Sequence, residues 1–389
     1  MAEMTKEELV KSLKNVKIVL GNGSDLYCDL KTRYSDYFET KKNYYSRIKN
    51  TYEQFKRQCD ISFEPEKLLF DIKTCFGNYP NFVKNLWDVL FCLSFSNNLN
   101  DVLWCDIEKR IHNSLTKKEK DGMKETNFSV IHWDEVNRLV GGYKYTSNTS
   151  AEELFAAMIS NIICNNKNEN GKYNFYEFLK EELIRFEFSF GQYIKDATNG
   201  GHLLKIRQER LLSRLCNIDE VVSIDTFNYS NFSGAPDNIS VKHINGTCDN
   251  PIFGIDKCLE DIEDNTLSLE ANNYVKTYRR MDLELIENNT IEQKEYENVI
   301  VFGHSLNKQD YSYFYPLLDK IRISDTTASS RFVIAYSIYN ELKAEEIRKN
   351  LKQSVINLFA TYEKEHLGSH DARLLDYLTT QDRIVFYEI

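Results

Sequence analysis

Glycine, amide, hydroxyl and ionisable residues gather in four short segments of this chain, at positions 21–25, 226–228, 243–246 and 303–310. Each segment follows a short apolar run rich in β-branched residues, which is typical of a buried parallel strand. Parallel strands of an open α/β sheet end at one edge, and ligands bind in the crevice outside that edge. The four segments therefore predict a nucleotide pocket.

The first segment is Gly21-Asn22-Gly23-Ser24-Asp25. Its two glycines allow backbone N–H groups to approach a phosphate without a Cβ clash, and the start of a helix adds a favourable dipole. The segment lacks the third glycine of GxGxxG and the Lys-Ser/Thr pair of a P-loop, so a tight turn without a ligand is the alternative. Because a carboxylate repels phosphate, we expect Asp25 to face a ribose or a metal ion.

The second and third segments offer groups for binding and acid–base chemistry. Thr226 and Asn228 lie at a strand end, where the Asn amide can exchange hydrogen bonds with ribose hydroxyls or hold a water. His243 and Asn245, followed by Gly246, share one face of a strand, and a histidine there is a candidate general base near neutral pH. The alternatives are ordinary turn residues and a core histidine satisfied by the backbone.

The fourth segment contains Gly303, His304 and Ser305, followed by Asp310. It is similar to the GxSxG elbow of serine hydrolases, but Asn307 stands where the second glycine is needed, so we do not expect Ser305 to be a nucleophile. Asp310 is expected at the start of a helix or as an anchor behind the site.

Outside these segments, Trp104 and Glu108 lie one helical turn apart. A carboxyl group beside a tryptophan can have a raised pKa, but an exposed helix face is the favoured interpretation of this pair. The sequence has no CxxC spacing, and no convincing set of metal ligands stands out, so no metal is expected.

Short apolar runs alternate with helical patterns along the chain, which predicts crossover connections and a parallel sheet. The fold class is α/β, with a parallel Rossmann-like sheet flanked by helices and a large helical insertion. We expect the Rossmann-like domain at 1–79 and 216–389 and the insertion at 80–215, and an acidic, solvated excursion at 256–297. Strands are predicted at 17–20, 221–224, 240–243, 251–255, 299–302, 331–335 and 383–387, and helices at 30–58, 82–93, 102–112, 151–163, 173–194, 203–215, 309–321 and 339–366.

The bulk composition excludes several classes of protein. With 389 residues and 42% apolar content, the chain can bury a large core. A net charge of −10 argues against a nucleic-acid partner. The N-terminus is polar and no run reaches the ~18 apolar residues of a spanning helix, so we expect no membrane association and a cytoplasmic location. The nine cysteines are scattered and expected to be reduced thiols.

Six motifs run through nearly the whole chain: VLGNGSDLYCDLKTRYSDYF (19–38), WCDIEKRI (104–111), SIDTFNYS (223–230), HINGT (243–247), FGID (253–256) and VFGHSLNKQD (301–310). Taken together, these motifs resemble those of the AbiH family of bacteriophage abortive-infection proteins. The order of the four segments is also similar to that of sirtuin-like NAD-binding domains. The resemblance implies that Gly21, Gly23 and Ser24 line a pyrophosphate, Asn228 holds the nicotinamide ribose or the attacking water, and the 243–246 segment supplies the base. Gly303 and Ser305 would contact the adenosine side.

Two residues depart from the family pattern. Ser24 replaces an aromatic residue, and Asn245 stands where a histidine commonly precedes the glycine. Asn cannot accept a proton as imidazole does, so either His243 is the base or hydrolysis is slow or absent. The leading hypothesis is a phage-defence NAD glycohydrolase, with Asn228, His243 and Asp25 as catalytic residues. The alternatives are a non-enzymatic nucleotide-sensing or partner-binding module, whose helical insertion touches a phage or host protein, and a nucleic-acid-cleaving effector. Under each hypothesis a phage or host protein is the candidate trigger, and homo-oligomerisation stays open. The choice among NAD, NADP and another nucleotide also stays open.

Overall fold

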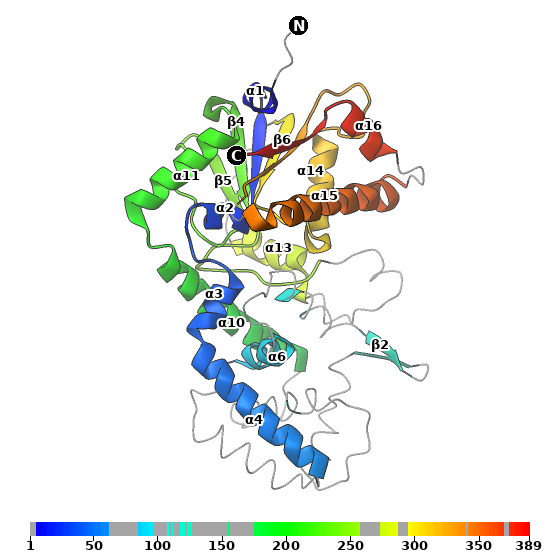
Figure 1. Ribbon diagram of the computed structural model, residues 1–389. Helices are drawn as coiled ribbons and strands as arrows, with labels where there is room; N and C mark the ends of the chain where they lie inside the picture. The colour runs from blue at the N-terminus through cyan, green and yellow to red at the C-terminus, as the bar shows by residue number, and fades with distance from the viewer. Residues whose placement is uncertain are drawn as a thin grey trace. The chain divides into compact units, whose positions relative to one another are not determined.

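The chain divides into two compact units (Figure 1). The sheet unit comprises Met1–Thr32, Gly191–Ile252 and Arg280–Ile389, and the helical unit comprises Arg33–Phe190 and Phe253–Arg279. The expected domain limits near residues 80 and 215 stay a prediction. The computed structural model describes residues 5–61, 85–95, 107, 108, 111, 117–120, 123–126, 155, 175–256, 273–286, 295–338, 341–368 and 373–389.

A six-stranded parallel sheet forms the centre of the sheet unit. Its strands are β1 (Val16–Leu20), β4 (Val221–Thr226), β5 (Ser240–His243), β6 (Asn298–Phe302), β7 (Phe332–Tyr336) and β8 (Ile384–Glu388). Across the sheet they are ordered β5-β4-β1-β6-β7-β8. This is the doubly wound order of a Rossmann-like sheet, with its switch point between β1 and β6. The predicted α/β class and parallel sheet are therefore confirmed.

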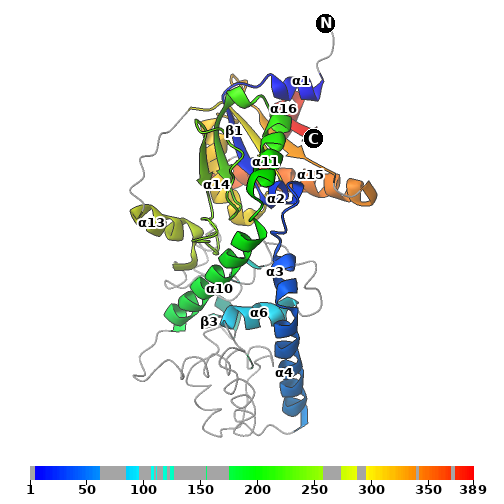
Figure 2. The same cartoon turned by 90° about the vertical axis from the view of Figure 1, so that its left-hand side faces the viewer.

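Helices cover both faces of the sheet. Successive side chains of a strand point to opposite faces. Ile18 and Leu20 of β1 accordingly join one apolar cluster, with α1 (Lys6–Lys11) and α11 (Gly201–Leu215). Val19 joins a second cluster, with α14 (Tyr311–Lys320), α15 (Ala344–Thr361) and α16 (Leu374–Thr380). Figure 2 shows α11 and α14 on opposite sides of the strands, and this double coverage explains the continuous apolar runs.

Shorter elements complete the sheet unit. The helix α2 (Asn22–Tyr27) follows β1 directly, so the first predicted segment forms the start of a helix. A π-helical turn at Tyr362–His366 continues α15, so the helical stretch predicted at 339–366 ends at the expected residue, although α15 itself begins only at Ala344. The 3-10 turns are η2 (Ile218–Glu220), η4 (Lys308–Asp310) and η5 (Glu341–Lys343).

The helical unit is built around aromatic side chains. The rings of Tyr34 and Phe190 stack with their centroids 4.7 Å apart, and Phe253 meets Phe186 edge to face at 5.3 Å. Such pairs add to the large apolar area that aromatic residues bury. The elements are α3 (Tyr34–Thr40), α4 (Lys42–Ile61), α6 (Leu86–Phe95), the first part of α10 (Phe175–Ala197), the start of α13 (Lys276–Ile286) and a hairpin of β2 (Lys117–Lys120) and β3 (Met123–Thr126).

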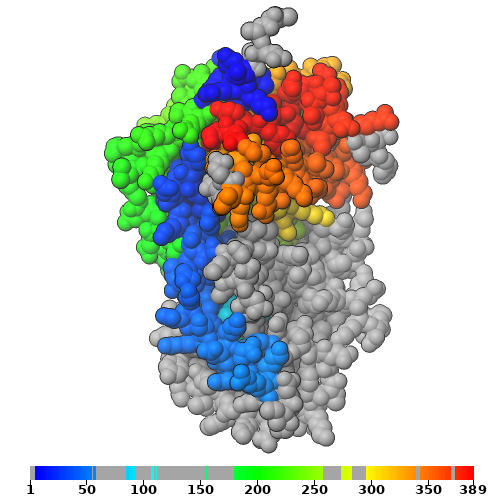
Figure 3. All heavy atoms as spheres, viewed as in Figure 1, coloured from blue at the N-terminus to red at the C-terminus, as the bar shows by residue number. Residues whose placement is uncertain are grey.

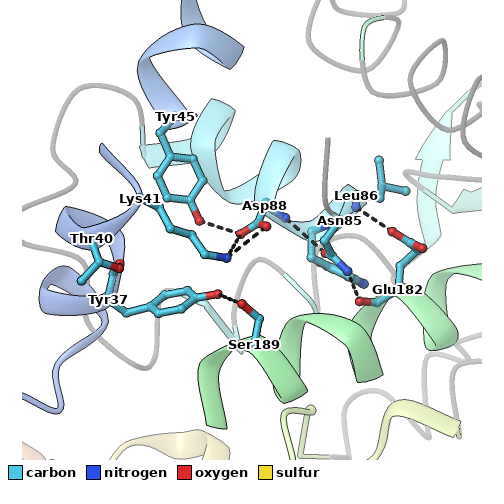
Figure 4. A network of polar contacts seen from close by, with 10 residues as sticks. Tyr37, Thr40, Lys41, Tyr45, Asn85, Leu86, Asp88, Glu182 and Ser189 are labelled. Atoms are coloured by element: carbon cyan, nitrogen blue, oxygen red, sulfur yellow. Dashed lines mark hydrogen bonds and ion pairs between the residues drawn. The ribbon is translucent and has the colours of Figure 1, made fainter. Parts of the chain in front are cut away.

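A buried carboxylate in this unit has a complete set of partners (Figure 4). Asp88 is 1% exposed and accepts hydrogen bonds from Tyr45 Oη at 2.7 Å and from Lys41 Nζ at 3.3 Å. The Lys41 ammonium also lies over the Tyr37 ring, 4.4 Å from its centroid. Burial, followed by the charge of Asp88, raises the pKa of Tyr45 well above its usual value. The group is thus a satisfied structural network, since each member meets a protein partner.

The structure overturns the exposed position expected for Glu108. Its side chain is fully buried, and Oε1 lies 2.5 Å from Nζ of Lys276, which is itself 2% exposed. A buried charge is tolerated only when it is paired, and this pairing cannot be inferred from positions 168 residues apart in sequence. The same contact shows that part of the expected solvated excursion at 256–297 is buried. Most of the helices predicted at 102–112 and 151–163 lie outside the described residues.

The strand predicted at 251–255 is also wrong. Pro251 and Ile255 take part only in isolated bridges, to Gly246 and Val275. Both backbone groups of Phe253 bond to side chains, because its amide donates to Glu187 Oε1 and its carbonyl accepts from Arg279. These side-chain bonds replace the ladder that a strand requires.

Candidate functional site

The four predicted segments end at one edge of the sheet. They follow β1, β4, β5 and β6, which are neighbours in the parallel sheet. Register pairs Leu20 with Thr226 and with Phe302, and Thr226 with His243. The strand ends are therefore level, and the residues that follow them share the edge at which α/β sheets bind ligands.

The glycines of the first segment pack directly on the loop after β6. Gly23 N donates to Gly303 O at 2.8 Å, and Gly21 N donates to Phe302 O at 2.9 Å. A Cβ on Gly23 would lie 2.6 Å from Gly303 Cα. Ser24 N donates to Gly21 O at 2.9 Å. Close backbone packing thus explains the glycines, and these three amides, expected to bind pyrophosphate, are bonded within the protein.

Asp25 is held inside the protein by neutral donors. It is 3% exposed, and both of its oxygens accept from Ser230 Oγ, at 2.7 and 2.8 Å. Burial raises the pKa of Asp25 to about 6, against the lowering effect of hydrogen bonds from Ser230, Thr32 and Asn228. Among the described residues it has no ion-pair partner. The carboxylate therefore faces protein groups, whereas the sequence suggested a ribose or a metal.

Replacing Asp25 with asparagine is expected to flatten the pH dependence of the unfolding free energy between about pH 4 and 6. The pKa of Asp25 is about 6 in the folded protein, whereas an unfolded aspartate titrates near 4. The folded state binds this proton more tightly, so its stabilising contribution is complete below about pH 4 and is lost as pH rises through about 6, on the order of 2–3 kcal/mol. Urea unfolding across this range measures the effect, and parallel curves for both proteins would contradict it.

Asn228 connects the β4 end to the first segment. It is 5% exposed, and its Nδ2 donates to Ser24 Oγ at 2.8 Å. The Ser24 hydroxyl in turn donates to Gly21 O at 2.8 Å. Thr226 Oγ1 accepts the Asn228 backbone N–H at 3.1 Å, so Thr226 shapes this turn. The Asn228 amide oxygen has no hydrogen bond to the described residues and can accept one from a ligand or water.

His243 is oriented by the same turn. Its Nδ1 lies 3.1 Å from the Asn228 carbonyl oxygen, which can only accept, so Nδ1 carries the proton. Nε2 then holds a lone pair, and no described residue bonds to it. Burial lowers the pKa of His243, so the imidazole is neutral at physiological pH. The geometry gives the half-buried ring the form of a general base.

Asn245 and Gly246 form a rigid turn after β5. Gly246 has φ +80, and a Cβ there would lie 2.0 Å from Asn250 O. Asn245 is 2% exposed, and its Oδ1 has no hydrogen-bond partner among the described residues. This backbone shape requires the glycine. The fold does not explain why Asn245 Oδ1 is buried without a hydrogen bond, because buried polar atoms are normally paired.

The loop after β6 turns two of its predicted ligand-binding residues inward. His304 Nδ1 accepts the Leu306 amide at 2.9 Å, and Nε2 lies 3.4 Å from Asp310 Oδ2. The ring packs against Phe227, 4.3 Å between centroids. His304 and Asp310 thus hold the loop together. Ser305 is exposed and accepts from Asn307 Nδ2 at 2.8 Å, which leaves its hydroxyl proton to donate elsewhere.

Two parts of this edge were not anticipated from sequence. Ser230 is the main partner of Asp25, and the SIDTFNYS motif that contains it is the only sequence signal. Below the edge, Asp225 accepts from Tyr313 Oη at 2.7 Å and lies 2.9 Å from Lys17 Nζ. Lys17 interrupts an apolar strand, and such a lysine indicates a buried partner.

No metal is supported by the described part of the chain, where no group of three or more His, Cys, Asp or Glu side chains could hold one. None of the described helices has the length and apolarity needed to cross a membrane. A separate groove of about 440 Å³ is formed by residues of α15, α16 and β8. Figure 3 shows α15 and α16, in orange and red, at the surface. Its lining includes Val355, Ile384 and Phe386 and none of the four segments.

Comparison with known proteins identifies the family. The family model described as bacteriophage abortive infection AbiH matches residues 18–332, from β1 to the start of β7. This range contains all four segments at the carboxyl edge. No curated protein matches the chain. The match spans well over half of the 389 residues, and the chain belongs to the AbiH family of bacteriophage abortive-infection proteins.

Proposed function

We propose that this phage-defence protein binds NAD at the carboxyl edge of β4 and β5 and hydrolyses its nicotinamide–ribose bond. The observation that carries the proposal is the pair of Asn228 and His243. The Asn228 carbonyl fixes Nδ1 of His243 as the protonated nitrogen, which leaves Nε2 as a base. Doubly wound sheets bind nucleotides at this edge, which supports a nucleotide as the ligand.

In the proposed reaction, a water oxygen attacks the ribose C1′ and the C1′–N bond breaks. Nicotinamide leaves with the bonding electrons as a neutral molecule, and ADP-ribose keeps the new hydroxyl. His243 Nε2 takes the proton of the water, which the Asn228 amide oxygen orients. Asp25, with a pKa of about 6, is ionised at pH 7. Its negative charge stabilises the positive charge that develops on the ribose in the transition state.

The experiment is to incubate the protein with NAD and to measure nicotinamide and ADP-ribose by chromatography with mass detection. His243→Gln, which removes the base, is expected to slow turnover by about 10²-fold. Because burial lowers the pKa of His243, wild-type turnover should hold through neutral pH and fall only on acidification. Equal turnover in wild type and variant would remove His243 from the mechanism.

A second candidate function is a non-enzymatic nucleotide sensor, triggered by or bound to a phage or host protein. It is favoured by the polar groups of the site that are already bonded within the protein, such as Asn228 to Ser24 and Asp25 to Ser230. It predicts that calorimetry detects NAD binding while no nicotinamide forms. NAD consumed with nicotinamide released would exclude it.

The proposal places the protein in the cytoplasm. Free thiols suit that reducing compartment. Within the described residues, the free cysteines are Cys28, Cys92, Cys216 and Cys248, and all are buried.

A further inference from the structure

Asn245 carries an acceptor that the free protein leaves unused. The residue is 2% exposed, and its Oδ1 is buried without a hydrogen bond to a described residue. Buried polar atoms in folded proteins nearly always have a partner, because an unsatisfied one keeps its full desolvation penalty. An exception at the ligand edge of a sheet calls for a partner that arrives from outside.

The backbone around Asn245 is held by hydrogen bonds on both sides. The carbonyl of Asn245 accepts the Ile252 amide at 2.7 Å, and the preceding amide, of Ile244, donates to Thr226 O at 2.8 Å. Gly246 then bridges to Pro251. The backbone is therefore ordered before any ligand binds, which lowers the entropy that binding must overcome.

Asn245 lies next to the candidate base along the chain. The strand β5 ends at His243, and Ile244 and Asn245 belong to the turn that follows it, so the strand face expected for His243 and Asn245 ends at His243. Ile244 packs in the cluster of Val19 and Phe227. The orphan acceptor thus lies two residues beyond the candidate base, at the carboxyl edge of the sheet.

We infer that Asn245 Oδ1 accepts a hydrogen bond from an N–H donor of the ligand, and that this donor is the carboxamide NH2 of nicotinamide. The inference rests on the proposed function, because it assigns a part of the same ligand. An acceptor discriminates between a carboxamide, which donates, and a carboxylate, which only accepts and is negatively charged. The site should therefore prefer NAD to nicotinic acid adenine dinucleotide, which differs only in this group.

The test combines two readouts on Asn245→Leu, a change of similar volume that removes the amide. Removal of an unsatisfied acceptor should leave the melting temperature unchanged or raise it by about 1–3 °C. Calorimetry should show that wild type binds NAD at least about tenfold more tightly than the deamidated dinucleotide, and that the variant loses this preference. The matched control is Asn298→Leu, because Asn298 is also buried but uses both its atoms, donating to Lys14 O and accepting from Arg331 N. This control should lower the melting temperature.

Three results would overturn the inference. A melting temperature that falls in Asn245→Leu as far as in Asn298→Leu would show that the amide is already satisfied, for example by a bound water. NAD affinity and preference unchanged in Asn245→Leu would show that the ligand does not touch it, while leaving the proposed function in place. Wild type that binds neither dinucleotide would overturn the proposed function and the ligand assignment together.

Discussion

Replacing Gly303 with alanine is expected to lower the free energy of unfolding by roughly 3–5 kcal/mol, from left-handed backbone strain and overpacking together. Gly303 has φ +70, and its Cβ would lie 2.5 Å from Ser24 N and 2.7 Å from Gly23 Cα. All of the nearby atoms belong to backbone, which cannot move aside without breaking the bond from Gly23 N to Gly303 O. Urea unfolding of both proteins measures the difference.

Gly201→Ala is the matched control. Gly201 also has a positive φ, +53, but no atom lies within 4 Å of the position of its Cβ. Its replacement should cost only the backbone strain, about 1–2 kcal/mol. If Gly303→Ala lowers the free energy of unfolding by no more than Gly201→Ala does, the loops at 21–24 and at Gly303 are not in close backbone contact. A larger loss in Gly303→Ala measures the strength of the contact between the first and fourth segments.

Asn228→Ala is expected to lower NAD turnover by roughly 10²–10³-fold or more, because it removes the group that orients the attacking water. The variant also loses the donor to Ser24 Oγ, so we expect about 1–2 kcal/mol of lost stability and an intact fold. Turnover should be measured beside the circular dichroism spectrum of each protein.

Asn298→Ala separates this effect from a general loss of stability. Asn298 is 6% exposed and hydrogen-bonded at the other end of the sheet, at the start of β6. The Asn298→Ala variant should lose at least as much stability as Asn228→Ala and keep the wild-type turnover of NAD. Unchanged turnover in Asn228→Ala, or an equal loss in Asn298→Ala, would remove Asn228 from the site.

Much of the sheet was predictable because a strand covered on both faces must be apolar throughout. The runs at 17–20, 221–224, 240–243, 299–302, 331–335 and 383–387 each correspond to an observed strand. The strand predicted at 251–255 is absent because the backbone groups of Phe253, at its centre, bond to the side chains of Glu187 and Arg279, which lie far away in sequence. The local sequence pattern therefore predicts which residues are buried better than it predicts which groups their backbone atoms hydrogen-bond to.

The site was predictable in position but less so in orientation. Strand ends and parallel topology place Gly21, Asn228, His243 and Gly303 at one edge. Whether a polar side chain faces a ligand or the protein depends on contacts between distant segments. His304 turns toward Asp310, and Asp25 toward Ser230, and no spacing in the sequence specifies either contact.

The most direct test is amide hydrogen exchange by mass spectrometry with and without NAD. If the nucleotide binds at the carboxyl edge, exchange should slow in peptides that contain residues 21–25, 226–230 and 243–246. Peptides from α15 and α16, which line the separate groove, should be unchanged. No protection at a saturating NAD concentration, or protection confined to α15 and α16, would contradict a nucleotide site at the ends of β1, β4 and β5.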